Sequence, residues 1–305
     1  CKQMFNLLWF CKKAGIPFEV YAFSNEWLSS KDDNYPDQLV DHYEKKENSL
    51  VIDDDFSLLN VLTSKTTTIE LEHQMLNIYR HAYSFCMMYS CTYTVGRKMS
   101  LSGTPLNESL ICLHQILPKF QRENKLQKVQ CIVLTDGEAC SLNYHRFVKR
   151  YWENNAEFLG VARFSPYKTI LRDRKIGHTY NFDNGFYGFT DVLLTNLRDN
   201  FPNVNFMGIR LLSPRDANAF IKLYYQDYHE YTKIQKEWKK EKSFVIRKSG
   251  YHAYFGLSCA SLAQEVDFDV NEDATKSQIK TAFAKSLKTK KLNKKVLGEF
   301  ISLVA

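Results

Sequence analysis

The segment from Val129 to Leu134 constrains the fold most strongly, because this short apolar run stops abruptly at Thr135-Asp136-Gly137. Runs of this kind, bounded by a turn signal, are typical of strands buried in a parallel sheet. An aspartate that follows such a strand lies at its carboxyl end, where open α/β sheets bind their ligands. The sequence therefore predicts an α/β fold with Asp136 at the ligand-binding edge of a sheet.

Other segments along the chain have the periodicity expected of such a fold. A second apolar run at 205–212 and an alternating segment at 18–24 predict two more strands of the same sheet. Apolar residues at helical spacing predict helices at 2–14, 105–121 and 216–227. Further helices are expected at 69–89, 189–200 and 230–243, strands at 49–55, 157–163 and 169–180, and a β-hairpin over 244–256. Alternating helices and strands indicate an α/β class with a doubly wound, mainly parallel sheet and flanking helices, as in Rossmann-like folds.

Changes in composition divide the chain into three parts. Residues 1–258 are predicted to form one α/β domain with an insertion at about 140–203, followed by an acidic linker at 259–272. A basic amphipathic helical tail is expected at 273–305, with an apolar stripe that packs on the domain. The lysines opposite that stripe would face an acidic partner or phosphates; they include Lys290, Lys291, Lys294 and Lys295.

Composition narrows the class of protein. Hydrophobic residues make up 44% of the 305, which is enough to fill a core, and the net charge of +7 permits contact with nucleic acid or an acidic partner. The eight cysteines include no CxxC pair, which favours reduced thiols. No run of eighteen apolar residues occurs, so no membrane span is expected. These features together predict a soluble, cytoplasmic protein.

Two oxygen-bearing residues are the candidate metal ligands. The loop Gly103-Thr104-Pro105 opens a predicted helix, and a Thr104 hydroxyl and an Asp136 carboxylate both suit a hard cation such as Mg2+. We expect both at the carboxyl edge of the sheet, within reach of one ion. In the alternative interpretation Thr104 caps the helix, Pro105 is its first residue and Asp136 belongs to an ordinary turn.

The other candidate groups have simpler explanations. Glu138 and the acidic run 53–55 are expected in solvated loops. Arg172, Arg174 and His178 could grip phosphate or an acidic surface, although a charged hairpin face explains them equally. No GxSxG, HExxH or GxxxxGK[ST] motif occurs, so no nucleophile, zinc site or ATP-hydrolysing loop is predicted. A metal ion without a nucleophile or base would serve to bridge to a partner's carboxylate.

The order of these parts resembles that of von Willebrand factor A (VWA) domains: a helix, a strand, a Gly-Thr-Pro-Leu loop and helix, then a strand ending in Thr-Asp-Gly. The resemblance is strongest to the intracellular branch, including the VWA-bearing subunit of cobaltochelatase and its relatives in tailed phages. It implies a metal-ion-dependent adhesion site (MIDAS) in which Thr104 and Asp136 hold Mg2+. It also implies a protein-interaction module whose partner is a MoxR-type AAA+ ATPase.

The Asp-x-Ser-x-Ser motif of VWA domains is not found in this chain. We therefore expect a fragment that begins just after this motif, with a gap or a substitute strand beside 129–135. Two other functions stay open. A metal-dependent hydrolase or peptidase would need a base or a second ligand cluster, which the sequence does not reveal. A nucleic-acid-binding protein would use the basic tail, which lacks interleaved aromatic residues, so this function is not favoured.

Overall fold

The computed structural model describes residues 2–25, 43–53, 55–86, 99, 101, 103–150, 155–182, 188–259, 278 and 281. Nearly all of the predicted linker and tail, including Lys290, Lys291, Lys294 and Lys295, lies outside the described residues.

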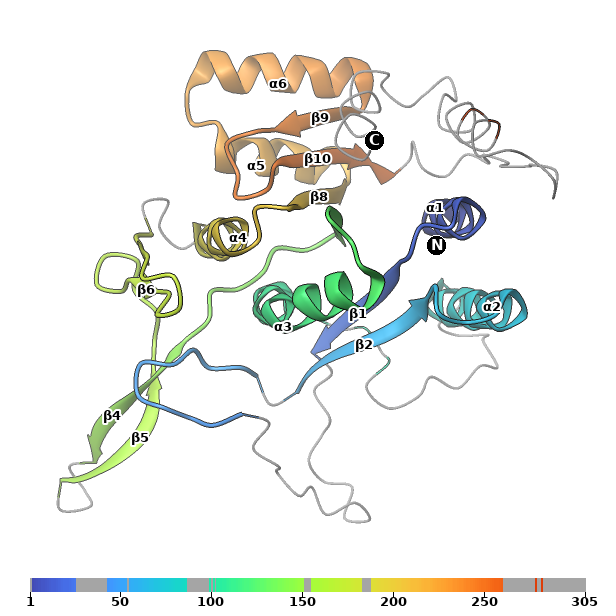
Figure 1. Ribbon diagram of the computed structural model, residues 1–305. Coiled ribbons are helices and arrows are strands. Elements are labelled where there is room, and N and C mark those ends of the chain that lie inside the picture. The colour runs from blue at the N-terminus through green and yellow to red at the C-terminus, as the bar shows by residue number, and fades with distance from the viewer. Residues whose placement is uncertain are drawn as a thin grey trace.

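A four-stranded sheet forms the centre of the fold (Figure 1). Strands β3 (Val129–Thr135), β8 (Val204–Leu212) and β10 (Ala253–Ser258) run parallel to their neighbours, and β9 (Ser243–Ile246) pairs antiparallel to β10 at the edge. The order is β3-β8-β10-β9. The predicted mainly parallel α/β sheet is therefore confirmed, together with its strands at 129–135 and 205–212 and the hairpin near the end of the domain.

Four helices pack against this sheet. They are α3 (Leu106–Asn124), α4 (Phe189–Asn200), α5 (Pro214–Tyr224) and α6 (Tyr228–Glu241). Their apolar side chains join those of the sheet in one large cluster, whose fully buried members include Leu110, Leu194, Phe206, Ile221 and Phe244. Each large apolar side chain buried in this way stabilises the fold by about 1.5–3 kcal/mol. This cluster holds both edges of the sheet in place.

The first predicted strand does not belong to the main sheet. Strand β1 (Glu19–Asn25) pairs antiparallel with β2 (Phe56–Thr63) in a separate two-stranded sheet. The prediction that 18–24 joins the parallel sheet was wrong, because it overlooked β2, which pairs with β1 along its whole length. Helices α1 (Lys2–Ala14) and α2 (Thr68–Cys86) lie on this side of the molecule, and a small core joins them to the ribbon (Figure 1).

The edge of β3 that faces away from β8 carries no strand among the described residues. The sequence predicts a gap or a substitute strand at this position, beside 129–135. The backbone donors and acceptors along that edge remain able to pair with a further strand.

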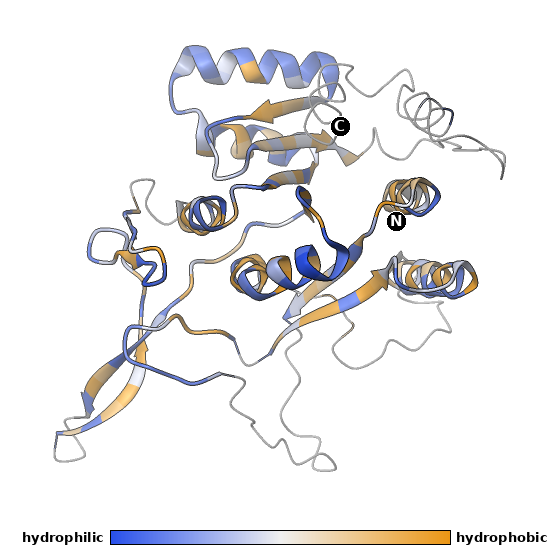
Figure 2. Ribbon diagram, viewed as in Figure 1, coloured by the Kyte–Doolittle hydropathy of each residue, from blue (hydrophilic) through white to orange (hydrophobic). Residues whose placement is uncertain are grey.

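The segment between β3 and α4 forms two hairpins. The first, β4 (Tyr144–Arg150) and β5 (Ala156–Ala162), extends away from the body of the molecule (Figure 1), and apolar positions recur along it (Figure 2). The second, β6 (Leu171–Arg172) and β7 (Thr179–Tyr180), is fastened to α4. Asp173 in its turn accepts hydrogen bonds from the amides of Asn196 and Asn200, both at 2.7 Å.

Within the described ranges, no helix has both the length and the apolar character needed to cross a bilayer. Five of the cysteines, Cys11, Cys112, Cys131, Cys140 and Cys259, are free thiols. Burial raises the pKa of Cys11 to about 11 and that of Cys131 to about 12, so both stay protonated at neutral pH. Thiols of this kind are poor nucleophiles.

Candidate metal-binding site at the carboxyl edge of the sheet

The loop before α3 and the turn after β3 lie against each other at the carboxyl edge of the sheet. A methyl group added at Gly137 would lie 2.5 Å from the Thr104 hydroxyl oxygen. The structure therefore places Thr104 beside the residue that follows Asp136. Glycine at position 137 is what allows this close approach, because any side chain would displace the hydroxyl. The sequence prediction that these two segments meet is consistent with this geometry.

The hydroxyl of Thr104 does not cap helix α3. The helix begins at Leu106, its N-cap residue is Pro105, and no side chain makes a capping hydrogen bond. The interpretation in which Thr104 caps the helix and Pro105 is the first helical residue was therefore wrong. Among the described residues, Thr104 uses only its backbone carbonyl, which accepts a hydrogen bond from the Leu106 N–H at 2.8 Å.

The side-chain oxygens of Thr104 and Asp136 are not used elsewhere in the part of the chain that the structure describes. Neither side chain makes a hydrogen bond or ion pair with another described residue. Asp136 is exposed and Thr104 is half-buried. Two oxygens of the types that hard cations prefer are thus presented to solvent at one edge of the sheet.

The turn that carries Asp136 is fixed from both sides. The Gly137 N–H donates a hydrogen bond to the Thr135 hydroxyl at 3.1 Å, which closes a tight turn directly after the strand. On the other side, the Arg210 guanidinium donates to the Gly137 carbonyl at 3.3 Å and forms an ion pair with Glu138. Arg210 lies opposite Thr135 in the parallel β3–β8 pair, so the sheet itself aligns these groups.

Arg210 is the functional residue that sequence analysis missed. Its side chain is only 10% exposed, and its guanidinium carbon lies 4.8 Å from the centre of the Phe220 ring. A buried guanidinium is tolerated only where it is paired and hydrogen-bonded. The sequence contains one indication of this role, because Arg210 is the only cation of the apolar run 205–212. A charged side chain in a buried strand needs an ion-pair or hydrogen-bond partner within the fold.

Glu138 has a different role from the one expected. Instead of standing free in a solvated loop, it pairs with Arg210 and anchors the turn. Burial raises the pKa of Glu138, and the neighbouring Arg210 lowers it. Because its carboxylate is already used by Arg210, Glu138 is a positioning residue for the Asp136 turn.

Asp191, in the first turn of α4, adds a second partly buried acid near this edge. Its carboxylate accepts a hydrogen bond from the Gly250 N–H at 2.8 Å. Burial raises its pKa to about 6, and the negative charge of Glu138 adds to the effect. Asp191 therefore changes its charge at a higher pH than an exposed aspartate does.

The end of β1 approaches the same loop. Gly103 has a positive φ of 71°, and a side chain there would lie 2.9 Å from the Asn25 β-carbon. The Asn25 amide in turn donates a hydrogen bond to the Asp53 carboxylate at 2.8 Å. Asp53 also accepts from the Asp55 N–H, as expected in a turn, while Asp54 lies outside the described residues.

Glu108, in the first turn of α3, is a buried acid whose charge interacts with that of Asp53. It is 7% exposed, and its pKa is raised by burial and further by the charge of Asp53. Even so, the described residues contain no group of three or more His, Cys, Asp or Glu side chains arranged to hold a metal ion. Asp136 therefore belongs to no such group among the described residues.

The remaining candidates lie elsewhere. Arg172 donates to the Thr179 hydroxyl at 2.6 Å across the β6–β7 hairpin, and Arg174 is exposed in its turn. His178 lies 3.5 Å from Asp199 of α4, whose carboxylate also accepts from the Tyr180 hydroxyl at 2.7 Å. These contacts fit the charged hairpin face that the sequence allowed, and they tie the hairpin to α4.

Comparison with protein-family models, with curated proteins and with solved structures found no match to this chain. The assignment of a function therefore depends on the geometry of the site.

Proposed function

We propose that this protein is a Mg2+-dependent protein-interaction module that works in the manner of a MIDAS-type VWA domain. In this proposal, Thr104 and Asp136 contribute two oxygens to the ion, and a carboxylate of the partner protein completes the shell. The observation that carries it is the packing of Thr104 against the Asp136–Gly137 turn, with both side-chain oxygens uncommitted among the described residues.

The chemistry of such a site favours binding over catalysis. Mg2+ keeps several waters and is commonly held by one or two carboxylates. With the single negative charge of Asp136 and the neutral Thr104 hydroxyl, the ion would keep a net positive charge. An ion in this state attracts a further carboxylate, and a protein partner can supply it by displacing a water.

The open edge of β3 supports the same proposal. Any strand that paired with it in parallel would end beside Thr104 and Asp136, because parallel strands share their carboxyl edge. Ligands at the end of such a strand would add to the two described oxygens. In VWA domains, the Asp-x-Ser-x-Ser segment occupies this position.

The partner class and location are part of the proposal. By the same resemblance we propose a MoxR-type AAA+ ATPase as the partner and the cytoplasm as the place where they meet. Arg210 and Glu138 would support the interaction indirectly, by holding the turn that carries Asp136.

The test is a titration with Mg2+ alone, followed by calorimetry, on the chain and two variants. Asp136→Ala should weaken Mg2+ binding at least about tenfold, because the only charged ligand among the proposed pair is removed. Glu72→Ala is a matched control, since Glu72 is an exposed acid on α2, which packs with the β1–β2 ribbon. Equal losses in the two variants, or an unchanged affinity in Asp136→Ala, would contradict the proposal.

A further inference from the structure

A shallow hollow of about 720 Å³ lies at the amino edge of the sheet, opposite the Asp136 turn. It is formed where α3 ends, where β3 begins and where the chain enters β8. Its lining is Pro118, Gln121, Arg122, Lys125, Leu126, Gln127, Lys128 and Asn203. Three of these residues are cations, three are amides and none is an acid. We refer to it as the basic hollow.

The walls of the basic hollow are held by backbone hydrogen bonds. The Leu126 N–H donates to the Gln121 carbonyl at 3.0 Å, which closes the end of α3, and the Leu126 side chain packs against the main core. The Val129 N–H donates to the Asn203 carbonyl at 3.1 Å, which joins the two sides of the hollow. The cations therefore project from a fixed frame, so a ligand would not have to order the backbone.

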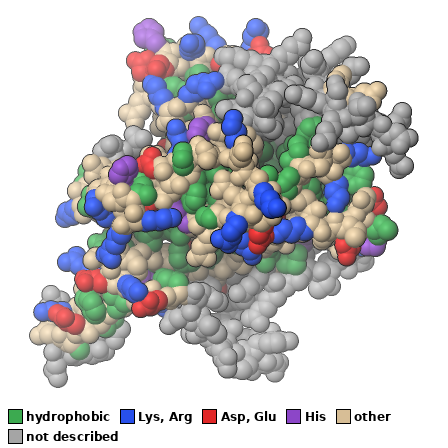
Figure 3. Space-filling model, in the orientation of Figure 1, with side chains coloured by type: hydrophobic (Ala, Val, Ile, Leu, Met, Phe, Trp, Pro, Cys, Tyr) green, Lys and Arg blue, Asp and Glu red, His purple; other side chains and the backbone are tan. Residues whose placement is uncertain are grey.

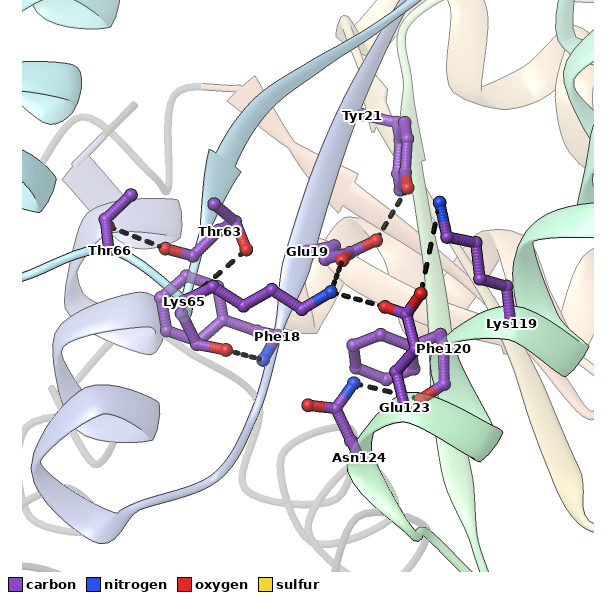
Figure 4. A network of polar contacts seen from close by, with 11 residues as sticks. Phe18, Glu19, Tyr21, Thr63, Lys65, Thr66, Lys119, Phe120, Glu123 and Asn124 are labelled. Carbon is purple, nitrogen blue, oxygen red and sulfur yellow. Dashed lines mark hydrogen bonds and ion pairs between the residues drawn. The ribbon is translucent and has the colours of Figure 1, made fainter.

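Two acids of the adjoining elements α3 and β1, Glu123 and Glu19, are paired with other cations. Glu123, next to Arg122 in α3, pairs with Lys65 and lies 4.0 Å from Lys119 (Figure 4). Glu19 of β1 pairs with the same Lys65 at 3.5 Å and accepts a hydrogen bond from the Tyr21 hydroxyl. This network joins α3 to β1 and neutralises its own charges, so the hollow keeps a positive balance.

The three cations of the hollow remain available to a ligand. Arg122, Lys125 and Lys128 are exposed, and none forms an ion pair with an acid within the described ranges. Figure 3 shows Lys and Arg side chains, with some Asp and Glu side chains among them, spread over one face of the molecule. A guanidinium fork and two ammonium groups around a hollow bordered by amide groups suit carboxylates or phosphates.

We propose that the basic hollow binds an acidic segment of a protein, through carboxylates of Asp or Glu side chains. Nucleic acid is the less suitable occupant for two reasons. No aromatic residue lines the hollow, so bases would find no ring on which to stack. Three cations also neutralise only about three phosphates, whereas proteins that bind DNA tightly make roughly six to ten such contacts.

The site is independent of the proposed metal site. It lies at the amino edge of the sheet, and Thr104 and Asp136 lie at the carboxyl edge. Asp136→Ala should therefore leave binding at the hollow unchanged, and loss of the hollow should leave Mg2+ binding unchanged. The two proposals can fail separately.

The experiment measures binding of a short, fluorescein-labelled oligoglutamate peptide by anisotropy at physiological ionic strength. Exposed ion pairs contribute up to about fivefold each in affinity, so the triple variant Arg122→Gln/Lys125→Gln/Lys128→Gln should lose affinity by at least about fivefold and at most about a hundredfold. The matched control is Lys233→Gln/Lys236→Gln/Lys239→Gln, which removes three exposed cations of α6 and the same net charge. The control should bind the peptide as tightly as the unaltered chain.

Three results would overturn the assignment. Equal losses in the two triple variants would show that only net charge matters, and full binding by the first triple would place the peptide elsewhere. A single-stranded oligodeoxynucleotide that binds more tightly than the peptide, and loses affinity in the first triple alone, would assign the hollow to nucleic acid. Thermal unfolding of each variant checks that the exposed substitutions leave the fold intact.

Discussion

The two edges of the central sheet differ in whether their cations are buried and paired or exposed to solvent. At the carboxyl edge, Arg210 is nearly buried and is paired with Glu138, and the pair holds the turn that presents Asp136. At the amino edge, the basic hollow carries Arg122, Lys125 and Lys128 in solvent. At the carboxyl edge, the charged pair fixes the backbone of the turn. At the amino edge, backbone hydrogen bonds fix the chain, and the charged side chains extend from it into solvent.

This difference has an energetic consequence. Interactions between charges strengthen as water is excluded, while an unpaired charge becomes costly in the same environment. Breaking the Arg210–Glu138 pair at the carboxyl edge should therefore change the free energy of unfolding, whereas removing an exposed charge at the amino edge should change binding and leave the free energy of unfolding almost unaltered.

The largest effect is expected at Arg210. Arg210→Ala removes the ion pair with Glu138 and the packing on Phe220, and it leaves a cavity beside the strand. We expect a loss of about 3 kcal/mol in the free energy of unfolding, measured by urea denaturation. Arg122→Ala is the control at the other edge, and it should stay within about 0.5 kcal/mol of the unaltered chain. Similar losses in both variants would break the comparison between the edges.

A smaller effect is expected from the protonation of Asp191. Its pKa is raised by burial from 3.8 to about 6, so the folded state binds a proton more tightly than the unfolded state does. Its contribution is fully present below about pH 4 and is lost as the pH rises through about 6. Asp191→Asn retains a hydrogen-bond acceptor for the Gly250 N–H and carries no charge. It should stabilise the protein by about 1–2 kcal/mol at pH 7.5 and by little at pH 4.

Urea denaturation of this variant and of the unaltered chain across that range measures the difference. A constant difference between the two proteins at all pH values would show that Asp191 does not titrate near pH 6.

The smallest effect is expected at the amino edge, in the backbone of Lys125. This residue follows α3 in the left-handed conformation, with φ 52° and ψ 45°, which glycine adopts at lower cost. Lys125→Gly should therefore stabilise the protein by about 0.5 kcal/mol, measured as a small rise in Tm. Lys128→Gly is the matched control, because Lys128 is not among the described residues with positive φ, and it should destabilise the protein slightly. If both variants raised Tm, the stabilisation would come from glycine anywhere in this loop and not from the positive φ of Lys125.

Local sequence was sufficient to identify most of the elements. The apolar runs at 129–135 and 205–212 became β3 and β8, since a strand buried on both sides needs apolar residues along its whole length. The helical stripes at 2–14 and 105–121 became α1 and α3, although α3 continues to Asn124. The same periodicity could not tell which strand pairs with which, so β1 was assigned to the wrong sheet.

The candidate site divides in the same way. The sequence by itself determined that Asp136 follows a buried strand and that Thr104 precedes a helix. The ends of strands and the starts of helices depend mainly on residues that are adjacent in the chain. Only the tertiary structure decided that Thr104 packs against Gly137, that Arg210 pairs with Glu138 and that the cations of α3 and its loop surround one hollow. Contacts between residues far apart in the chain depend on strand order and packing, and neither is encoded in any single segment.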